Sequence, residues 1–173
     1  MGFHHVALAT RDLQATHRFY TETMGFELAK VVAAKSPEGG WAKHVFYRMP
    51  GGDLFAFWEL HEMELREDWS PAISTGMGLP AWVNHIAFRA DDRADVERRK
   101  AAWLAAGFDV MEVDHGWCVS VYAVDPNGIL VEWCLDTRPL GAQDREEAER
   151  LLADPHPPLE ANAHVVFHKA PAR

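Results

Sequence analysis

The sequence predicts an α+β fold made of two βαβββ modules, because the chain repeats one series of motifs at nearly the same spacing. The series is a His-led apolar run, an aspartate and a Gly-Phe-acid triplet; it occurs at residues 5–8, 12 and 25–27, and again at residues 85–88, 92 and 107–109. The chain has 173 residues, of which 48% are hydrophobic and 25% charged, so a packed core is expected.

Each copy begins with a short β-type run that ends near an aspartate, Asp12 or Asp92, able to cap a helix. A helix follows and stops at a glycine, Gly25 or Gly107, which can adopt the left-handed conformation of a helix C-terminus. Turn residues then separate three further strands, expected at residues 26–33, 42–48 and 54–60 in the first copy and at 108–113, 117–124 and 129–135 in the second.

These elements divide the chain into a first module at residues 1–60, a linker at 61–81, a second module at 82–135 and a C-terminal extension at 136–173. The extension is expected to form a helix at about residues 142–153 and a last strand at 163–168. A four-stranded sheet with one helix leaves one face uncovered. The two modules should therefore pair, within one chain or across a homodimer, so that their concave faces form a cleft.

The charge balance favours a small-molecule partner. Asp and Glu number 26 against 17 Lys and Arg, and the net charge of −9 argues against nucleic acid or an anionic membrane as the main partner. The N-terminal residues lack the features of a signal peptide, and no apolar run approaches the ~20 residues of a membrane span, so a cytoplasmic protein is expected. Cys118 and Cys134 are then expected as reduced core residues.

Ten histidines make metal chemistry worth testing, and the repeat indicates which of them to consider. In each copy a His lies on the first strand and a Glu near the end of the fourth: His5 with Glu59, and His85 with Glu132. A single His on a strand is more often structural, but a repeated His-plus-Glu pattern favours a metal site. Two His and one carboxylate with open positions suit Fe(II).

With these residues in view, the sequence resembles the vicinal oxygen chelate superfamily, which includes glyoxalase I, methylmalonyl-CoA epimerase, fosfomycin and bleomycin resistance proteins, and type I extradiol dioxygenases. The resemblance covers residues 3–135. It implies paired βαβββ modules whose cleft is centred on a metal held by first-strand His and fourth-strand Glu residues.

A more specific resemblance, to the signature segment of extradiol dioxygenases, runs from Val113 to Glu132. It implies Fe(II) and a catechol-type substrate that chelates the metal through vicinal oxygens. His115 and Tyr122 would supply general acid/base and hydrogen-bonding groups, since the chelated diol loses a proton and the bound oxygen receives one. A structural reading stays open for each, because His115 can be an exposed loop residue and Tyr122 a core residue.

Two features of the first copy favour other activities. The family usually carries another acid/base His just before the fourth strand, where this chain has Gly51-Gly52-Asp53. Glu59 completes a two-His, two-Glu set, as in glyoxalase- or epimerase-like enzymes that use Ni(II), Zn(II) or Co(II), with Mn(II) as a further candidate. Glu59 could also support a ligand or face away. A non-catalytic protein that sequesters a drug or toxin is the remaining alternative.

Overall fold

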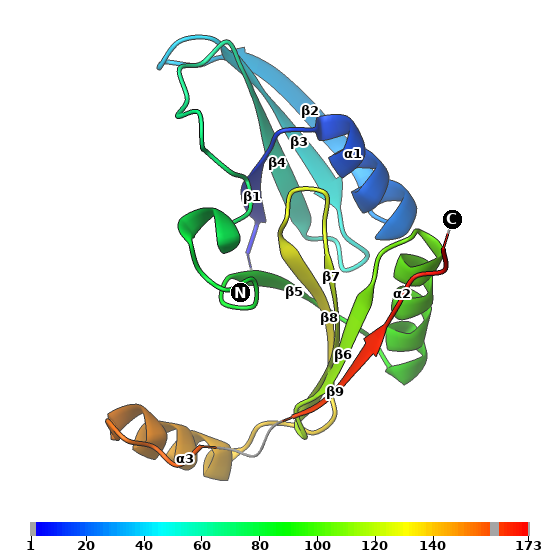
Figure 1. Cartoon of the computed structure of the whole chain (residues 1–173), viewed down its shortest axis with the longest axis vertical. Coiled ribbons are helices and arrows are strands. Elements are labelled where there is room, and N and C mark those ends of the chain that lie inside the picture. Colours follow the sequence, from blue (N-terminus) through cyan, green and yellow to red (C-terminus); the bar gives the residue numbers. More distant parts are fainter. Residues whose placement is uncertain (1–2, 160–162, 173) are drawn as a thin grey trace. The chain divides into compact units, whose positions relative to one another are not determined.

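The computed structural model describes residues 3–159 and 163–172, and it contains two mixed sheets (Figure 1). The first sheet has the order β1-β4-β3-β2, and its strands are β1 (His5–Thr10), β2 (Glu27–Lys35), β3 (Trp41–Arg48) and β4 (Leu54–His61). The second has the order β5-β8-β7-β6-β9, and its strands are β5 (His85–Arg89), β6 (Val110–Asp114), β7 (Cys118–Val124), β8 (Leu130–Asp136) and β9 (His164–His168). The predicted α+β class is confirmed.

The helices follow the predicted order and carry the predicted caps. They are α1 (Leu13–Arg18), which continues into a π-helical turn η1 (Phe19–Thr23), α2 (Arg93–Ala105) and α3 (Ala142–Ala153), with a short 3-10 turn η2 (Thr75–Met77). The Asp12 carboxylate accepts from the amide of Ala15 at 2.9 Å. Gly25 and Gly107 have φ of 74° and 89°, so each helix ends at a residue for which the left-handed conformation costs little.

The face of the first sheet that carries Phe55 and Phe57 is the core of its module. Tyr20, from η1, packs against both rings, with centroids 5.3 and 4.8 Å away. At the end of β1, the Thr10 hydroxyl hydrogen-bonds that of Thr16 in α1 at 2.8 Å. Because successive strand residues point to opposite faces, the next residue on each strand points away from α1.

The second sheet packs against α2 in the same way. Trp103 of α2 is fully buried, and the guanidinium of Arg99, also on α2, lies over the Trp133 ring at 4.0 Å. Phe88 of β5 contacts Trp133, with ring centroids 5.4 Å apart. Phe88 and Trp133 therefore mark the helix face of this sheet, and Glu132, next to Trp133 along β8, points to the opposite face.

The C-terminal extension adds a fifth strand to the second sheet. The strand expected at residues 163–168 is β9, which runs antiparallel to β6 with Val165 opposite Val113 (Figure 1). The predicted helix is α3, and none of its residues is buried. The second sheet is thus larger than the four-stranded module that the repeat predicted.

By compactness the chain divides into one unit of residues 1–86 and 123–131 and another of residues 87–122 and 132–173. The turn at residues 125–128 groups with the first unit because the Tyr20 hydroxyl donates to Asp125 at 3.0 Å and the Asn127 amide donates to Thr16 at 3.1 Å.

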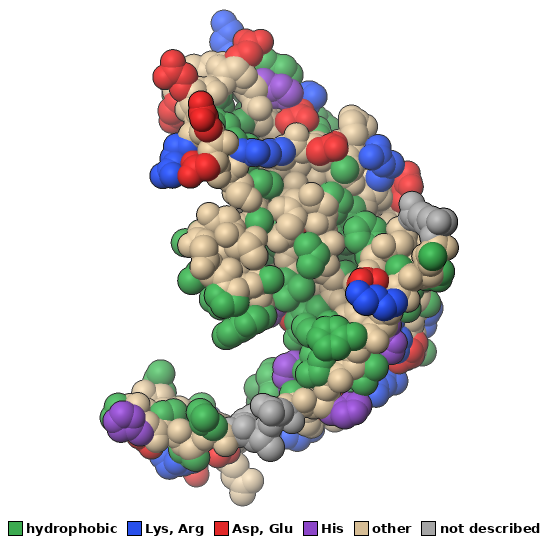
Figure 2. Space-filling model, in the orientation of Figure 1, with side chains coloured by type: hydrophobic (Ala, Val, Ile, Leu, Met, Phe, Trp, Pro, Cys, Tyr) green, Lys and Arg blue, Asp and Glu red, His purple; other side chains and the backbone are tan. Residues whose placement is uncertain are grey.

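Acidic and basic side chains lie interspersed on the face shown in Figure 2. None of the helices in the described part of the chain is long and apolar enough to span a membrane. Cys118 and Cys134 are free thiols; Cys118 lies in the core as predicted, whereas Cys134 is half-buried.

Candidate active site

His5 lies on the face of the first sheet that points away from α1. Its ring contacts His44 and Phe46 of β3, with centroids 5.9 and 5.5 Å away, and His44 in turn stacks on Trp58 of β4 at 3.8 Å. We call His5, His44, Phe46 and Trp58 the four-ring cluster. His5 is exposed, and its Nδ1 lies 2.8 Å from Nδ1 of His4. Burial, together with the neighbouring His5, lowers the pKa of His44.

His85 begins β5, and a backbone contact sets its tautomer. Nδ1 of His85 lies 2.9 Å from the carbonyl oxygen of Trp82. A carbonyl oxygen can only accept, so Nδ1 carries the proton. The neutral ring then has its lone pair on Nε2, which is the arrangement found when a backbone carbonyl orients a metal-binding histidine. His85 and Phe88 are an odd number of residues apart on β5, so His85 points away from the helix face.

Glu132 is 4% exposed and lies among polar groups of β7. The hydroxyl of Ser120, which is fully buried, donates to Oε1 of Glu132 at 2.5 Å. Tyr122 interacts with both Ser120 and Glu132, and burial raises the pKa of the Tyr122 hydroxyl well above its ordinary value. Because β5 and β8 are neighbouring strands, His85 and Glu132 belong to adjacent strands of one sheet.

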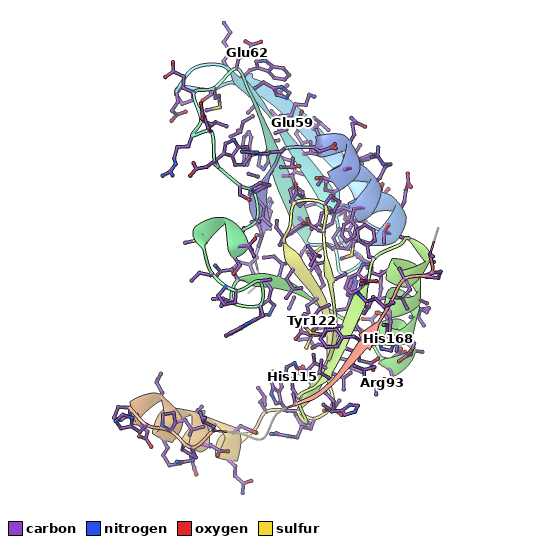
Figure 3. All side chains as sticks on the ribbon, in the orientation of Figure 1. Glu59, Glu62, Arg93, His115, Tyr122 and His168 are labelled. Atoms are coloured by element: carbon purple, nitrogen blue, oxygen red, sulfur yellow. The ribbon has the colours of Figure 1, made fainter. Side chains whose placement is uncertain are left out.

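His115 and Tyr122 form a hydrogen-bonded pair. Nε2 of His115 lies 3.2 Å from the Tyr122 hydroxyl, and both side chains are labelled in Figure 3. The tight turn between β6 and β7 holds His115 in place. Gly116 has φ of 81°, and its amide donates to the carboxylate of Asp114 at 2.8 Å. Of the predicted site residues, the structure brings His115 and Tyr122 into contact with each other, and Tyr122 also interacts with Glu132.

Glu59 lies in a different environment from His5. The register of the parallel pair β1–β4 sets His5 opposite Leu54 and Glu59 opposite Thr10, so five residue steps, or about 16 Å, separate the two positions along the strands. Glu59 also shares the Thr10 face, which is the face of α1, whereas His5 points the other way.

Two basic side chains, those of Lys43 and His61, contact the Glu59 carboxylate. Nζ of Lys43 lies 2.9 Å from Oε2, and Nε2 of His61 lies 2.7 Å from the same oxygen. Burial by itself would raise the pKa of Glu59, but the hydrogen bonds and charges of Lys43 and His61 outweigh it, so the pKa is lowered. Glu59, which is labelled in Figure 3, therefore acts in the structure as the charge partner of Lys43 and His61.

The family model described as the Glyoxalase/Bleomycin resistance protein/Dioxygenase superfamily matches residues 2–133. The chain belongs to this superfamily. The match spans the first predicted module and nearly all of the second, and it ends before α3 and β9. No match was found among curated proteins.

Solved structures share the superfamily fold. A glyoxylase/bleomycin resistance protein/dioxygenase domain from Frankia sp. EAN1pec is 19% identical, with a TM-score of 0.60 over 79% of this chain and 98% of that one. Lactoylglutathione lyase from Agrobacterium tumefaciens is 25% identical, with a TM-score of 0.52 over 78% and 92%. The fosfomycin resistance protein FosX from Listeria monocytogenes, complexed with Mn(II) and sulfate, is 19% identical, with a TM-score of 0.52 over 84% and 97%.

The superfamily repeat indicated the His and Glu positions, but it missed two residues beside them. Ser120 is a small polar residue in a strand, and only its hydrogen bond to Glu132 distinguishes it. His44 lies on β3, where the repeat has no matching residue, and its contact with His5 depends on the pairing of three strands. Within residues 3–159 and 163–172, no three His, Cys, Asp or Glu side chains form a group that could hold a metal ion.

We expect the Glu59→Gln variant of this superfamily member to keep the metal content of the wild type, because Glu59 lies on the face opposite His5. Loss of the ion pair with Lys43 should lower stability by about 0–1 kcal/mol, since both side chains are partly solvated. Metal analysis after anaerobic loading and thermal denaturation would check both values. A metal-free Glu59→Gln protein would restore Glu59 as a ligand and favour a four-ligand site.

Proposed function

We propose that this chain is a divalent-metal enzyme in which His5, His85 and Glu132 hold the metal, and that it acts on a small molecule with vicinal oxygens. The three ligands come from both modules, so the proposal requires the modules to pair, in one chain or in a homodimer. Two imidazoles and one carboxylate are suitable donors for Fe(II) and leave positions for substrate and oxygen.

The surroundings of the ligands support this assignment. The proton at Nδ1 of His85 leaves Nε2 as the coordinating atom in the neutral ring. Glu132 is a buried carboxylate, and burial of a charged group is costly unless it is paired or hydrogen-bonded. The donor from Ser120 compensates part of this cost, and a cation would compensate more.

The reaction we propose is extradiol cleavage of a catechol-type substrate. The observation that carries it is the hydrogen-bonded pair of His115 and Tyr122 in contact with the polar groups around Glu132. The position of Glu59 on the opposite face from His5 adds support, because a three-ligand metal leaves more open positions than a four-ligand one.

The bound Fe(II) would supply the chelation that lowers the pKa of the substrate diol and brings O2 beside it. In the overall reaction, the O–O bond and one ring C–C bond beside the hydroxyls break. The oxygens of O2 end on the two separated carbons, so O2 is the only oxidant required. The Tyr122 hydroxyl would donate a hydrogen bond to an oxygen of the substrate or of O2, while Nε2 of His115 would accept or return a proton through that hydroxyl.

Anaerobically purified protein loaded with Fe(II) should consume one O2 for each catechol in an oxygen-electrode assay. Protein loaded with Zn(II) should consume none, since Zn(II) does not change its oxidation state. A screen of substituted catechols would define the substrate. Absence of oxygen uptake with every catechol would reject the dioxygenase proposal.

A glyoxalase-like lyase or isomerase is the second candidate. The 25% identity to lactoylglutathione lyase from Agrobacterium tumefaciens favours it, and FosX from Listeria monocytogenes, which was crystallised with Mn(II), has the same fold. Isomerisation of a hemithioacetal by the Ni(II), Zn(II), Co(II) or Mn(II) form, without oxygen uptake by the Fe(II) form, would select this candidate.

A further inference from the structure

The His44 side chain has a buried polar atom that the fold leaves unsatisfied. Nε2 of His44 is shielded from solvent and has no hydrogen-bond partner among the described residues. Leaving a buried donor or acceptor unpaired costs free energy, and native structures contain few such atoms. An unpaired atom of this kind beside a candidate metal ligand indicates a partner that the chain itself does not supply.

Aromatic neighbours hold the His44 ring in one orientation. It stacks on Trp58 with centroids 3.8 Å apart and planes 14° apart, and it contacts Phe46 at 4.0 Å. His44 and Trp58 are directly opposite in the β3–β4 register, so the sheet itself aligns the two rings. Because both contacts restrict rotation of the imidazole, Nε2 has a fixed direction.

The same face of β1 is lined by small side chains beyond His5. Ala7 and Ala9 follow His5 at alternate positions and point to the same side, and Ala9 lies opposite Trp58 in the β1–β4 register. Trp58 is 36% exposed. The methyl groups of Ala7 and Ala9 and the exposed indole of Trp58 form an apolar surface. A flat aromatic ring can stack on such a surface.

We propose that the four-ring cluster binds the ring of a phenolic ligand and that Nε2 of His44 is the hydrogen-bond partner of a hydroxyl on that ring. His44 lies next to the candidate ligand His5 without belonging to the proposed ligand set, so it would recognise the substrate rather than the metal. This inference deepens the proposed function and rests on it for the choice of catechol as the probe.

The test is calorimetric titration of catechol into metal-free protein and into Zn(II)-loaded protein, in which binding occurs without turnover. His44→Phe keeps a ring against Trp58 but removes the nitrogen, so catechol affinity should fall about 10-fold or more. His44→Gln places an amide near the position of Nε2 and should restore the affinity to within about threefold of wild type. The Zn(II) content of both variants should equal that of wild type.

His61→Phe is the matched control, because His61 stacks on Trp41 with centroids 3.9 Å apart but belongs to the α1 face of the sheet. Its catechol affinity should not change. In wild-type protein, the ¹⁵N resonance of His44 Nε2 should shift on addition of catechol, which tests the contact even if His44→Phe does not fold.

The outcomes separate the two proposals. Catechol binding that depends on His44, without oxygen uptake by the Fe(II) form, would retain the phenolic site and reject the dioxygenase. Oxygen uptake with unchanged affinity in His44→Phe, and no shift of the Nε2 resonance, would overturn the role of His44 and retain the dioxygenase. Absence of catechol binding to wild type in both metal states, or loss of Zn(II) in the His44 variants, would also overturn the inference.

Discussion

Replacement of His5, His85 or Glu132 by alanine is expected to lower the metal content of the protein to below about a tenth of the wild-type value, since each change removes one of three donors. The effect of Glu132→Ala should be the clearest, because its carboxylate is buried and brings the only formal negative charge to the proposed ligand set. Metal analysis after anaerobic loading and desalting would measure the loss.

Matched variants distinguish loss of a ligand from loss of the fold. Glu59→Ala and His168→Ala remove the same residue types from positions that bind other side chains: Glu59 pairs with Lys43, and His168 lies 3.0 Å from Glu112. Both should keep full metal content. Circular dichroism of the ligand variants should match wild type. Unchanged metal content in His5→Ala, His85→Ala and Glu132→Ala together would refute the site.

Tyr122→Phe and His115→Ala are expected to reduce turnover of catechol by about 100- to 10,000-fold, the usual range for loss of a positioned proton-transfer group. Chelation of the diol is the task of the metal, so the Kd for catechol in the Zn(II) form should change by less than about fivefold. The two residues act through one hydrogen bond of 3.2 Å, so the double variant should lose little more activity than the worse single variant.

The comparison of kcat with Kd decides whether the pair is catalytic. Steady-state oxygen uptake gives kcat, and calorimetry with the Zn(II) form gives Kd. Tyr47→Phe is a suitable control, because Tyr47 is a buried tyrosine on the α1 face of the first sheet. Equal losses of kcat in Tyr122→Phe and Tyr47→Phe would assign Tyr122 to the core instead.

The sequence by itself determined the modules, because their signals are local or periodic. Asp12 and Gly25 mark a helix start and stop through side-chain capping and a positive φ, and both signals are independent of the rest of the fold. The duplicated series also predicted two His-plus-Glu pairs, since a repeat shows equivalent positions without showing where they point.

Only the tertiary structure decided the environment of each side chain. In the sequence Glu59 and Glu132 both lie near the end of a fourth strand, and the longer spacing of Glu59 from its turn leaves the direction of its side chain open. Strand register places Glu59 on the helix face beside Lys43, while Glu132 points away from its helix and accepts from Ser120. A one-residue difference in position along a strand exchanges the two faces of a sheet, and composition does not reveal it.

The contact between His44 and His5, and the addition of β9 to β6, likewise depend on pairing between distant segments. The sequence predicts a last strand at residues 163–168, because the tendency to form a strand is local. The partner of that strand depends on which sheet edge is accessible in the folded chain. For the same physical reason, the repeat could identify donor residues in this protein, but the packing of strands decides what surrounds them.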